Sequence, residues 1–123
     1  SIHCKNNFPF EKENSNLDVP IDDEVDDVKY INILTKTLDQ IESNFTPDIV
    51  FYDAGVDVHS NDDLGNLNLT DDGIKKRDEI VCEYFKEKKI PLCTVIGGGY
   101  SKNRHELASR HFSIFETVSK TYL

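Results

Sequence analysis

The spacing of hydrophobic residues along the chain changes several times, and each change marks the boundary of a predicted element. Over residues 28–44 the apolar side chains recur every three or four positions, which predicts an amphipathic helix that a Thr-Pro pair ends. A similar spacing over residues 74–85, preceded by Thr70 as an N-cap, predicts a second helix that ends before Pro91. A third helix is predicted from about Asn103 to near the C-terminus.

Short apolar runs lie between these predicted helices and are typical of strands. Residues 49–52 and 92–96 are almost entirely apolar, so we expect two strands that are buried on both faces. Residues 17–21 predict a further short strand, and residues 1–3 predict the end of another. Strands that alternate with helices favour an α/β fold, in which flanking helices cover a parallel sheet.

Two loops follow the predicted buried strands, at residues 53–68 and 97–103. In an open α/β sheet, ligands bind beyond the carboxyl ends of the strands, so we expect the chemistry to lie in these loops. Asp53 and Asp57 could act there as metal ligands or as a general base, although Asp is also common in turns for its own backbone hydrogen bonding. An EF-hand is excluded, because Asp62 occupies the position where that calcium loop requires glycine.

The second loop reads Gly97-Gly-Gly-Tyr100 and has a different character. Glycines after a strand let the backbone turn sharply and approach a ligand closely. A phosphate-binding P-loop is excluded, because its Lys-Ser/Thr pair is absent. A glycine run alone is weak evidence of a site, but a tyrosine that directly follows such a turn can donate a hydrogen bond to an oxyanion.

The composition narrows the possible partners. The chain has 123 residues, the size of one domain, and a formal net charge of -9 that disfavours direct binding to nucleic acid or to an anionic membrane. No apolar run approaches the length of a membrane span. The three cysteines form no Cys-x-x-Cys pair, which indicates reduced thiols and a cytoplasmic location, or a nuclear one in a eukaryote. The chain contains no Met, so we expect an N-terminal part of the domain to precede Ser1.

Taken together, the two loops resemble the C-terminal pattern of the histone deacetylase superfamily, with the closest likeness to its class IV and bacterial branch. The motifs that carry the resemblance are, in order, Asp53-Ala-Gly-Val-Asp57, Asp62, Leu64-Gly65, Leu69-Thr70, Arg77-Asp78 and Gly97-Gly-Gly-Tyr100. The upstream motifs that agree with it are Ser1-Ile-His3, Asn7-Phe-Pro-Phe10 and Asp18-Val-Pro20. The resemblance covers essentially the whole chain. It implies that residues 1–123 form the C-terminal part of one arginase/deacetylase-like, three-layer α/β/α domain.

The resemblance also assigns roles to individual residues. It implies that Asp57 is the last protein ligand of a catalytic zinc, and that Tyr100 stabilises the tetrahedral intermediate beside this zinc. The residues that it places along the substrate channel are Phe8, Gly98 and Gly99. A looser match places Ser1 and Ile2 at a site for a monovalent cation such as K⁺. His59 and Asp62 are expected to shape the loop and not to bind metal.

The family's paired histidines do not occur in this sequence. The one Asp-x-His triplet, Asp57-Val-His59, begins with the residue that the resemblance matches to the last zinc ligand, so the family's separate upstream Asp-x-His ligand motif is also missing. A catalytic zinc generally has three protein ligands, so an upstream segment of the same protein is needed to complete the site, and the chain alone should be inactive. The predicted function of the parent protein is zinc-dependent hydrolysis of acetyl or other acyl groups from lysine-like amines or polyamines.

Two alternatives to this function stay open. One is a catalytically inactive deacetylase-fold binding module, or an isolated fragment. The other is a receiver-like signalling domain that accepts a phosphoryl group on Asp53. A receiver domain needs an acidic pair after its first strand and a lysine after a later strand, and neither is evident at the required place.

Overall fold

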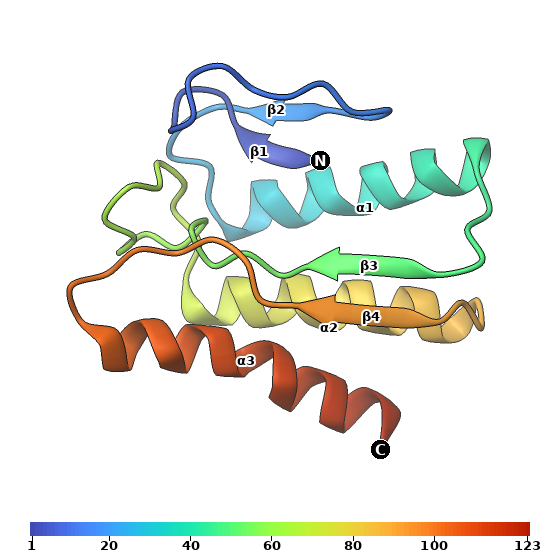
Figure 1. The fold of residues 1–123 in the computed structure, drawn as a ribbon. Helices are drawn as coiled ribbons and strands as arrows, with labels where there is room; N and C mark the ends of the chain where they lie inside the picture. Colours follow the sequence, from blue (N-terminus) through green and yellow to red (C-terminus); the bar gives the residue numbers. More distant parts are fainter.

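The computed structural model describes residues 1–123 and contains four strands and three helices (Figure 1). In chain order these are β1 (Ile2–Cys4), β2 (Val19–Ile21), α1 (Asp27–Asn44), β3 (Val50–Asp53), α2 (Asp71–Glu87), β4 (Leu92–Val95) and α3 (Arg104–Tyr122). Every predicted helix and strand is present near its predicted position. Thr70 caps α2 as predicted, because its side chain accepts a hydrogen bond from the Gly73 backbone N–H.

The strands pair in parallel, but they form two separate pairs. β1 is hydrogen-bonded to β2 and β3 to β4, with no hydrogen bond between the two pairs. In the register of the pairs, Ile2 lies opposite Val19 and Val50 lies opposite Leu92. All four arrows point the same way in Figure 1, so their carboxyl ends lie at one end of the molecule. The prediction of parallel strands with flanking helices is confirmed, although these residues form no single continuous sheet.

The hydrophobic core has two main parts. In one part, Leu34 and Leu38 of α1 pack with Val81 and Phe85 from the C-terminal half of α2. The other part gathers around the carboxyl ends of β1 and β2 and the loop after β3, and its buried members are Cys4, Ile21, Val25, Tyr30, Val56, Leu67, Leu69 and Ile74. Val56 belongs to this second cluster and Val58 packs against it, so the residues on both sides of Asp57 are anchored in the core. This packing holds the first candidate loop in place. None of the three helices combines the length and the apolar character that a membrane span requires.

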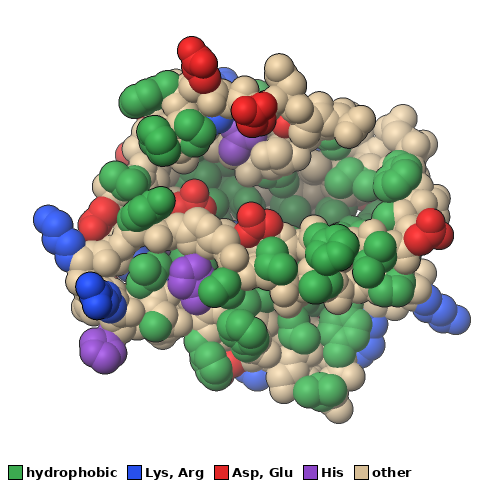
Figure 2. Space-filling view, viewed as in Figure 1, with side chains coloured by type: hydrophobic (Ala, Val, Ile, Leu, Met, Phe, Trp, Pro, Cys, Tyr) green, Lys and Arg blue, Asp and Glu red, His purple; other side chains and the backbone are tan.

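The prediction that the strands of residues 49–52 and 92–96 are buried on both faces is wrong for this chain. Phe51 on β3 is 70% exposed, and Cys93 and Val95 on β4 are also exposed, while the residues that alternate with them are half-buried. Alternate residues of a strand point to opposite faces, so the helices cover one face of the β3–β4 pair and leave the other open. Figure 2 shows hydrophobic side chains gathered over this part of the molecule, and a hollow with a hydrophobic floor between the β1–β2 pair and β3.

The N-termini of α1 and α2 are joined through side chains. The Asp27 carboxylate, in the first turn of α1, accepts hydrogen bonds from the Thr70 backbone N–H at 2.9 Å and from the Thr70 hydroxyl at 2.6 Å. A Cβ atom on Gly73 would lie 1.8 Å from Asp27 Oδ1, so a larger residue there would displace the Asp27 carboxylate from this contact. The contact fixes the downstream end of the loop that carries Asp57.

Thr70→Ala should therefore lower the free energy of unfolding by about 1–2 kcal/mol, because it removes both the N-cap of α2 and the hydroxyl donor to Asp27. Urea unfolding of the full-length protein, followed by circular dichroism, measures the change. Thr70→Ser keeps the hydroxyl and is the matched control, with an expected loss of less than half as much. Equal losses in the two variants would show that the hydroxyl does not stabilise this junction.

Candidate functional site

The two candidate loops meet at the carboxyl ends of β3 and β4, as predicted. Asp53 ends β3 directly beside Val95, which ends β4. The chain then turns so tightly that side chains from the first loop lie against the glycines of the second. A Cβ on Gly97 would lie 1.7 Å from Asp53 Oδ1, and a Cβ on Gly98 would lie 2.5 Å from Asp57 Oδ1. The glycines thus give the two carboxylates their space.

Asp57, the predicted zinc ligand, is a half-buried carboxylate. Burial raises the pKa of its carboxyl group, and the nearby carboxylates of Asp62 and Asp53 raise it further, whereas its own backbone N–H and the Arg77 guanidinium act in the opposite direction. No hydrogen bond from another residue stabilises the charged form. A bound cation would compensate for this desolvation, so the residue fits a metal ligand.

Asp57 belongs to no cluster of possible metal ligands in this structure. No group of three or more His, Cys, Asp or Glu side chains lies close enough together to hold a metal ion. Zinc in a catalytic site has three protein ligands and an open position. Asp57 therefore accounts for one ligand of such a site.

Phe8, predicted to line the substrate channel, borders the same cavity as Asp57. This cavity has a volume of about 350 Å³ and is also lined by Ser1, His3 and Lys12. The Lys12 ammonium donates a hydrogen bond to the Asn7 side chain at 3.0 Å and further bonds to two backbone carbonyls, which shapes the loop that carries Phe8. The structure thus brings together the predicted zinc ligand and the predicted channel wall, which are 49 positions apart in the printed sequence.

Ser1 and Ile2, predicted to bind a monovalent cation, lie at the start of β1. The Ser1 hydroxyl lies 3.1 Å from His3 Nδ1, and the Ser1 carbonyl accepts a hydrogen bond from the Val19 backbone N–H at 2.8 Å. Ser1 lines the Asp57 cavity, and Ile2 packs against the core cluster near it. The cation site at these residues stays a prediction.

Tyr100, the predicted oxyanion donor, lies on a loop that borders a neighbouring cavity of about 300 Å³. Gly98 and Gly99 line this cavity with it, and their φ angles of +29° and +120° are accessible to glycine at little cost. The Tyr100 side chain is 57% exposed, so its hydroxyl is available to a ligand. The roles of Tyr100 and of both glycines stay predictions.

His59 and Asp62 shape the first loop, as expected. His59 is buried, its Nδ1 accepts a hydrogen bond from the Asn61 backbone N–H at 3.0 Å, and its Nε2 lies 3.3 Å from Asp71 Oδ1. Burial lowers the pKa of this histidine. The Asp62 carboxylate accepts three backbone hydrogen bonds, one of which comes from Tyr100.

The sequence analysis missed the structural role of Arg77 and Asp78, which are 4% and 1% exposed. The Arg77 guanidinium donates to the Gly55 carbonyl at 2.6 Å and to Asp78 Oδ1 at 2.9 Å, and the Tyr52 hydroxyl donates to the same Asp78 oxygen at 2.6 Å. This buried network holds the chain where it leaves β3. A signal was present in the sequence, because a charged pair falls on the apolar side of an amphipathic helix, at helical spacing from Ile74.

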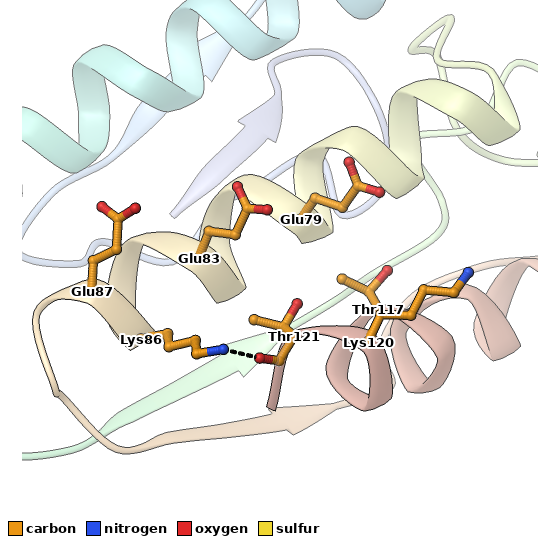
Figure 3. Close-up of a pocket in the computed structure, with 7 residues that line it drawn as sticks. All are labelled: Glu79, Glu83, Lys86, Glu87, Thr117, Lys120 and Thr121. Atoms are coloured by element: carbon orange, nitrogen blue, oxygen red, sulfur yellow. Dashed lines mark hydrogen bonds between the residues drawn. The ribbon is translucent and has the colours of Figure 1, made fainter. Parts of the chain in front are cut away.

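A third cavity, of about 520 Å³ and lined by polar side chains, lies between the C-terminal halves of α2 and α3 (Figure 3). Figure 3 shows Lys86 reaching from α2 to the Thr121 carbonyl of α3, to which it donates a hydrogen bond. The other side chains that line it are Glu79, Glu83, Glu87, Thr117 and Lys120. The C-terminus of α2 leads to the start of β4, so this cavity lies at the opposite end of the strands from Asp57. None of the predicted site residues lines it.

Comparison with known proteins places these residues in a family context. The model of the histone deacetylase domain matches residues 1–114. An uncharacterized protein of Picosynechococcus sp. is 41% identical over 122 residues, which make up 99% of this chain and 41% of that protein. Histone deacetylase 2 of Arabidopsis thaliana is 41% identical over 75 residues, or 61% of this chain and 19% of that protein.

Solved structures agree with these sequence matches. The crystal structure of a histone deacetylase homologue from Aquifex aeolicus superposes with a TM-score of 0.76 at 27% identity, and the match covers 96% of this chain and 34% of that one. The chain thus spans about two-fifths or less of the length of these three relatives.

Proposed function

This chain belongs to the histone deacetylase family, and we propose that it is the C-terminal part of a zinc-dependent deacetylase. The proposed reaction is hydrolysis of the amide bond between an acetyl or other acyl group and a lysine-like amine. The observation that carries the proposal is the Asp57 carboxylate, which lies half-buried against Gly98, has no hydrogen-bond donor from another residue and borders a cavity shared with Phe8.

In this proposal, each residue has a distinct task. Asp57 supplies one negatively charged oxygen ligand to the metal. A zinc ion bound at this carboxylate would supply Lewis-acid chemistry toward the amide carbonyl. Tyr100 donates a hydrogen bond to the carbonyl oxygen as negative charge develops on it, which stabilises the transition state more than the bound substrate. Phe8, Gly98 and Gly99 border the channel that holds the acylated side chain.

The open surfaces of the chain support the further proposal that an upstream segment completes the site. Asp57 lies in no group of three or more possible metal ligands, and the β3–β4 pair leaves Phe51 and Val95 exposed on one face. The hollow in Figure 2, between the β1–β2 pair and β3, also has a hydrophobic floor. Exposed apolar surface of this kind is typical of a face that another part of the protein covers. We therefore propose that an upstream segment packs here and brings the missing ligands.

The proposed substrates are acetylated lysine side chains or acetylpolyamines. Relatives include a histone deacetylase from Arabidopsis and a histone deacetylase homologue from Aquifex, which supports an acylated amine as the substrate class. The net charge of -9 favours cationic molecules over nucleic acid. A K⁺ ion at Ser1 and Ile2 is a further part of the proposal, and the position of Ser1 on the wall of the Asp57 cavity supports it.

Removal and return of the metal tests this proposal on the full-length protein. After the metal has been removed with a chelator, hydrolysis of an acetyl-lysine peptide should fall to background, and about one equivalent of Zn²⁺ per chain should restore it. Mg²⁺, which prefers octahedral oxygen ligands, is the control and should not restore activity. A protein that binds the peptide but does not hydrolyse it with any zinc content would instead be the inactive binding module.

A further inference from the structure

We infer that Asp62 sets the position of Tyr100 relative to Asp57, and that it acts in the reaction as a positioning residue without touching the substrate. The inference rests on the proposed function, because it gives Asp57 and Tyr100 their roles. Asp62 is nearly buried, with 9% of its surface exposed, and it lies on the loop between β3 and α2.

One oxygen of the Asp62 carboxylate holds the tyrosine loop. Asp62 Oδ2 accepts a hydrogen bond of 2.6 Å from the backbone N–H of Tyr100. The carbonyl group of Tyr100 is held as well, because it accepts a hydrogen bond of 2.9 Å from the Asp63 backbone N–H. Asp63 Oδ2 also accepts a hydrogen bond from the Lys102 backbone N–H at 3.1 Å. The backbone of an exposed tyrosine is thus fixed at two points to Asp62 and Asp63, which lie 38 and 37 positions upstream in the printed sequence.

The other oxygen of the same carboxylate holds the chain beside Asp57. Asp62 Oδ1 accepts hydrogen bonds from the backbone N–H groups of Leu64 at 2.9 Å and Gly65 at 2.7 Å. This turn packs directly on the backbone of Asp57, since a Cβ on Gly65 would lie 2.0 Å from the Asp57 carbonyl oxygen. A single carboxylate therefore links the backbone of the proposed zinc ligand to the backbone of the proposed oxyanion donor.

The chemistry of the carboxylate explains why an aspartate is needed here. Three N–H donors converge on Asp62, and an ionised carboxylate has acceptor positions on both oxygens and no hydrogen of its own. An asparagine side chain can satisfy the turn with its oxygen, but its NH₂ group then faces the Tyr100 N–H, donor against donor. Asp62→Asn should therefore keep the turn beside Asp57 and release the loop of Tyr100.

Hydrogen exchange of the Tyr100 amide tests the contact without reference to activity. In the unchanged full-length protein, this amide should exchange at least about tenfold more slowly than in an unstructured peptide, although the side chain is exposed. In Asp62→Asn, its exchange should be faster by about tenfold, which corresponds to the loss of one hydrogen bond. Asp72→Asn makes the same change of charge on the solvent-exposed surface of α2, and it should leave this amide unchanged. Absence of protection in the unchanged protein overturns the inference, even if Asp62→Asn does not fold.

Kinetics of the zinc-loaded full-length protein tests the positioning role. Asp62→Asn should lower kcat by about 10- to 100-fold, with little change in KM and in zinc content, because the tyrosine is displaced from the reacting carbonyl. When Tyr100→Phe is already present, adding Asp62→Asn should lower kcat by less than about threefold, since the positioned hydroxyl is gone. A purely structural defect would instead lower the activity by the same factor in both backgrounds.

The outcomes separate this inference from the proposed function. If Tyr100→Phe lowers kcat strongly but Asp62→Asn leaves it within about twofold of the unchanged protein, the positioning role is overturned and the deacetylase proposal stands. If the two losses multiply in the double variant, the positioning role is likewise overturned. If Tyr100→Phe itself leaves kcat unchanged, the proposed role of the tyrosine is overturned, and the role of Asp62 with it.

Discussion

Replacing Asp57 with alanine should abolish stoichiometric zinc binding in the full-length protein and reduce deacetylation by more than about 100-fold. Changes to residues that only support the metal ligands usually cost about 10- to 100-fold, so the loss of a ligand itself should cost more. Asp57 is the one residue of this chain that we propose as a zinc ligand, and two remaining ligands would leave the metal weakly held. Alanine also removes the carboxylate that lies against Gly98. Zinc content by elemental analysis of the purified variant, with its hydrolysis rate, measures both effects.

Asp53→Asn is the matched control for this experiment. Asp53 lies four positions earlier, at the end of β3, and its carboxylate contacts Gly97 as that of Asp57 contacts Gly98. The amide group of asparagine has nearly the same shape as the carboxylate of aspartate, so Asp53→Asn should keep about one zinc per chain. Full zinc occupancy in Asp57→Ala would refute the assignment of the ligand. Loss of zinc in both variants would point to general disruption of the loop and not to coordination.

Tyr100→Phe should lower kcat by about 100- to 1,000-fold, the usual cost of removing one oxyanion donor, while KM and zinc content stay close to those of the unchanged protein. The hydroxyl stabilises charge that develops only as the carbonyl is attacked, so its loss affects the transition state more than the bound substrate. The Tyr100 side chain is more than half exposed, and the change should therefore cost little stability. Steady-state kinetics with an acetyl-lysine peptide gives kcat and KM separately.

Tyr84→Phe provides the control for this second variant, because it removes the same single oxygen atom from a tyrosine on α2. The Tyr84 hydroxyl donates to the Leu38 carbonyl and to Glu42, far from the two candidate loops. The kcat of the Tyr84→Phe variant should equal that of the unchanged protein. An unchanged kcat in Tyr100→Phe as well would remove the tyrosine from the mechanism, and a large rise in KM alone would make it a substrate-binding residue.

Local patterns in the sequence were sufficient to predict the elements of this fold. Helical spacing of the apolar residues placed α1, the Thr70 cap placed the start of α2, and the short apolar runs placed β3 and β4. These signals act between residues close in the chain, through helix periodicity, capping and strand propensity. The same order of elements placed both candidate loops at the carboxyl ends of the strands, where the structure brings Asp57 against Gly98.

The burial of the strands could not be predicted in this way. An apolar run indicates that something covers both faces, and Phe51 is nevertheless exposed in this chain. An apolar side chain is more stable when it is buried, but the side chain alone does not show which segment of the protein buries it. The separation of the β1–β2 pair from the β3–β4 pair could not be predicted either. An apolar run indicates a strand, but it does not show which other strand lies beside it.

The residue types and their order thus contained the family resemblance, the identity of Asp57 and Tyr100 as candidate residues, and the positions of the helices and strands. Only the tertiary structure showed that Arg77 binds the Gly55 carbonyl, and that the two oxygens of Asp62 hold the backbones beside Asp57 and at Tyr100. Hydrogen bonds between distant segments depend on how the loops close in space. In the sequence, such residues are isolated polar positions, and only the folded chain shows which groups they bind.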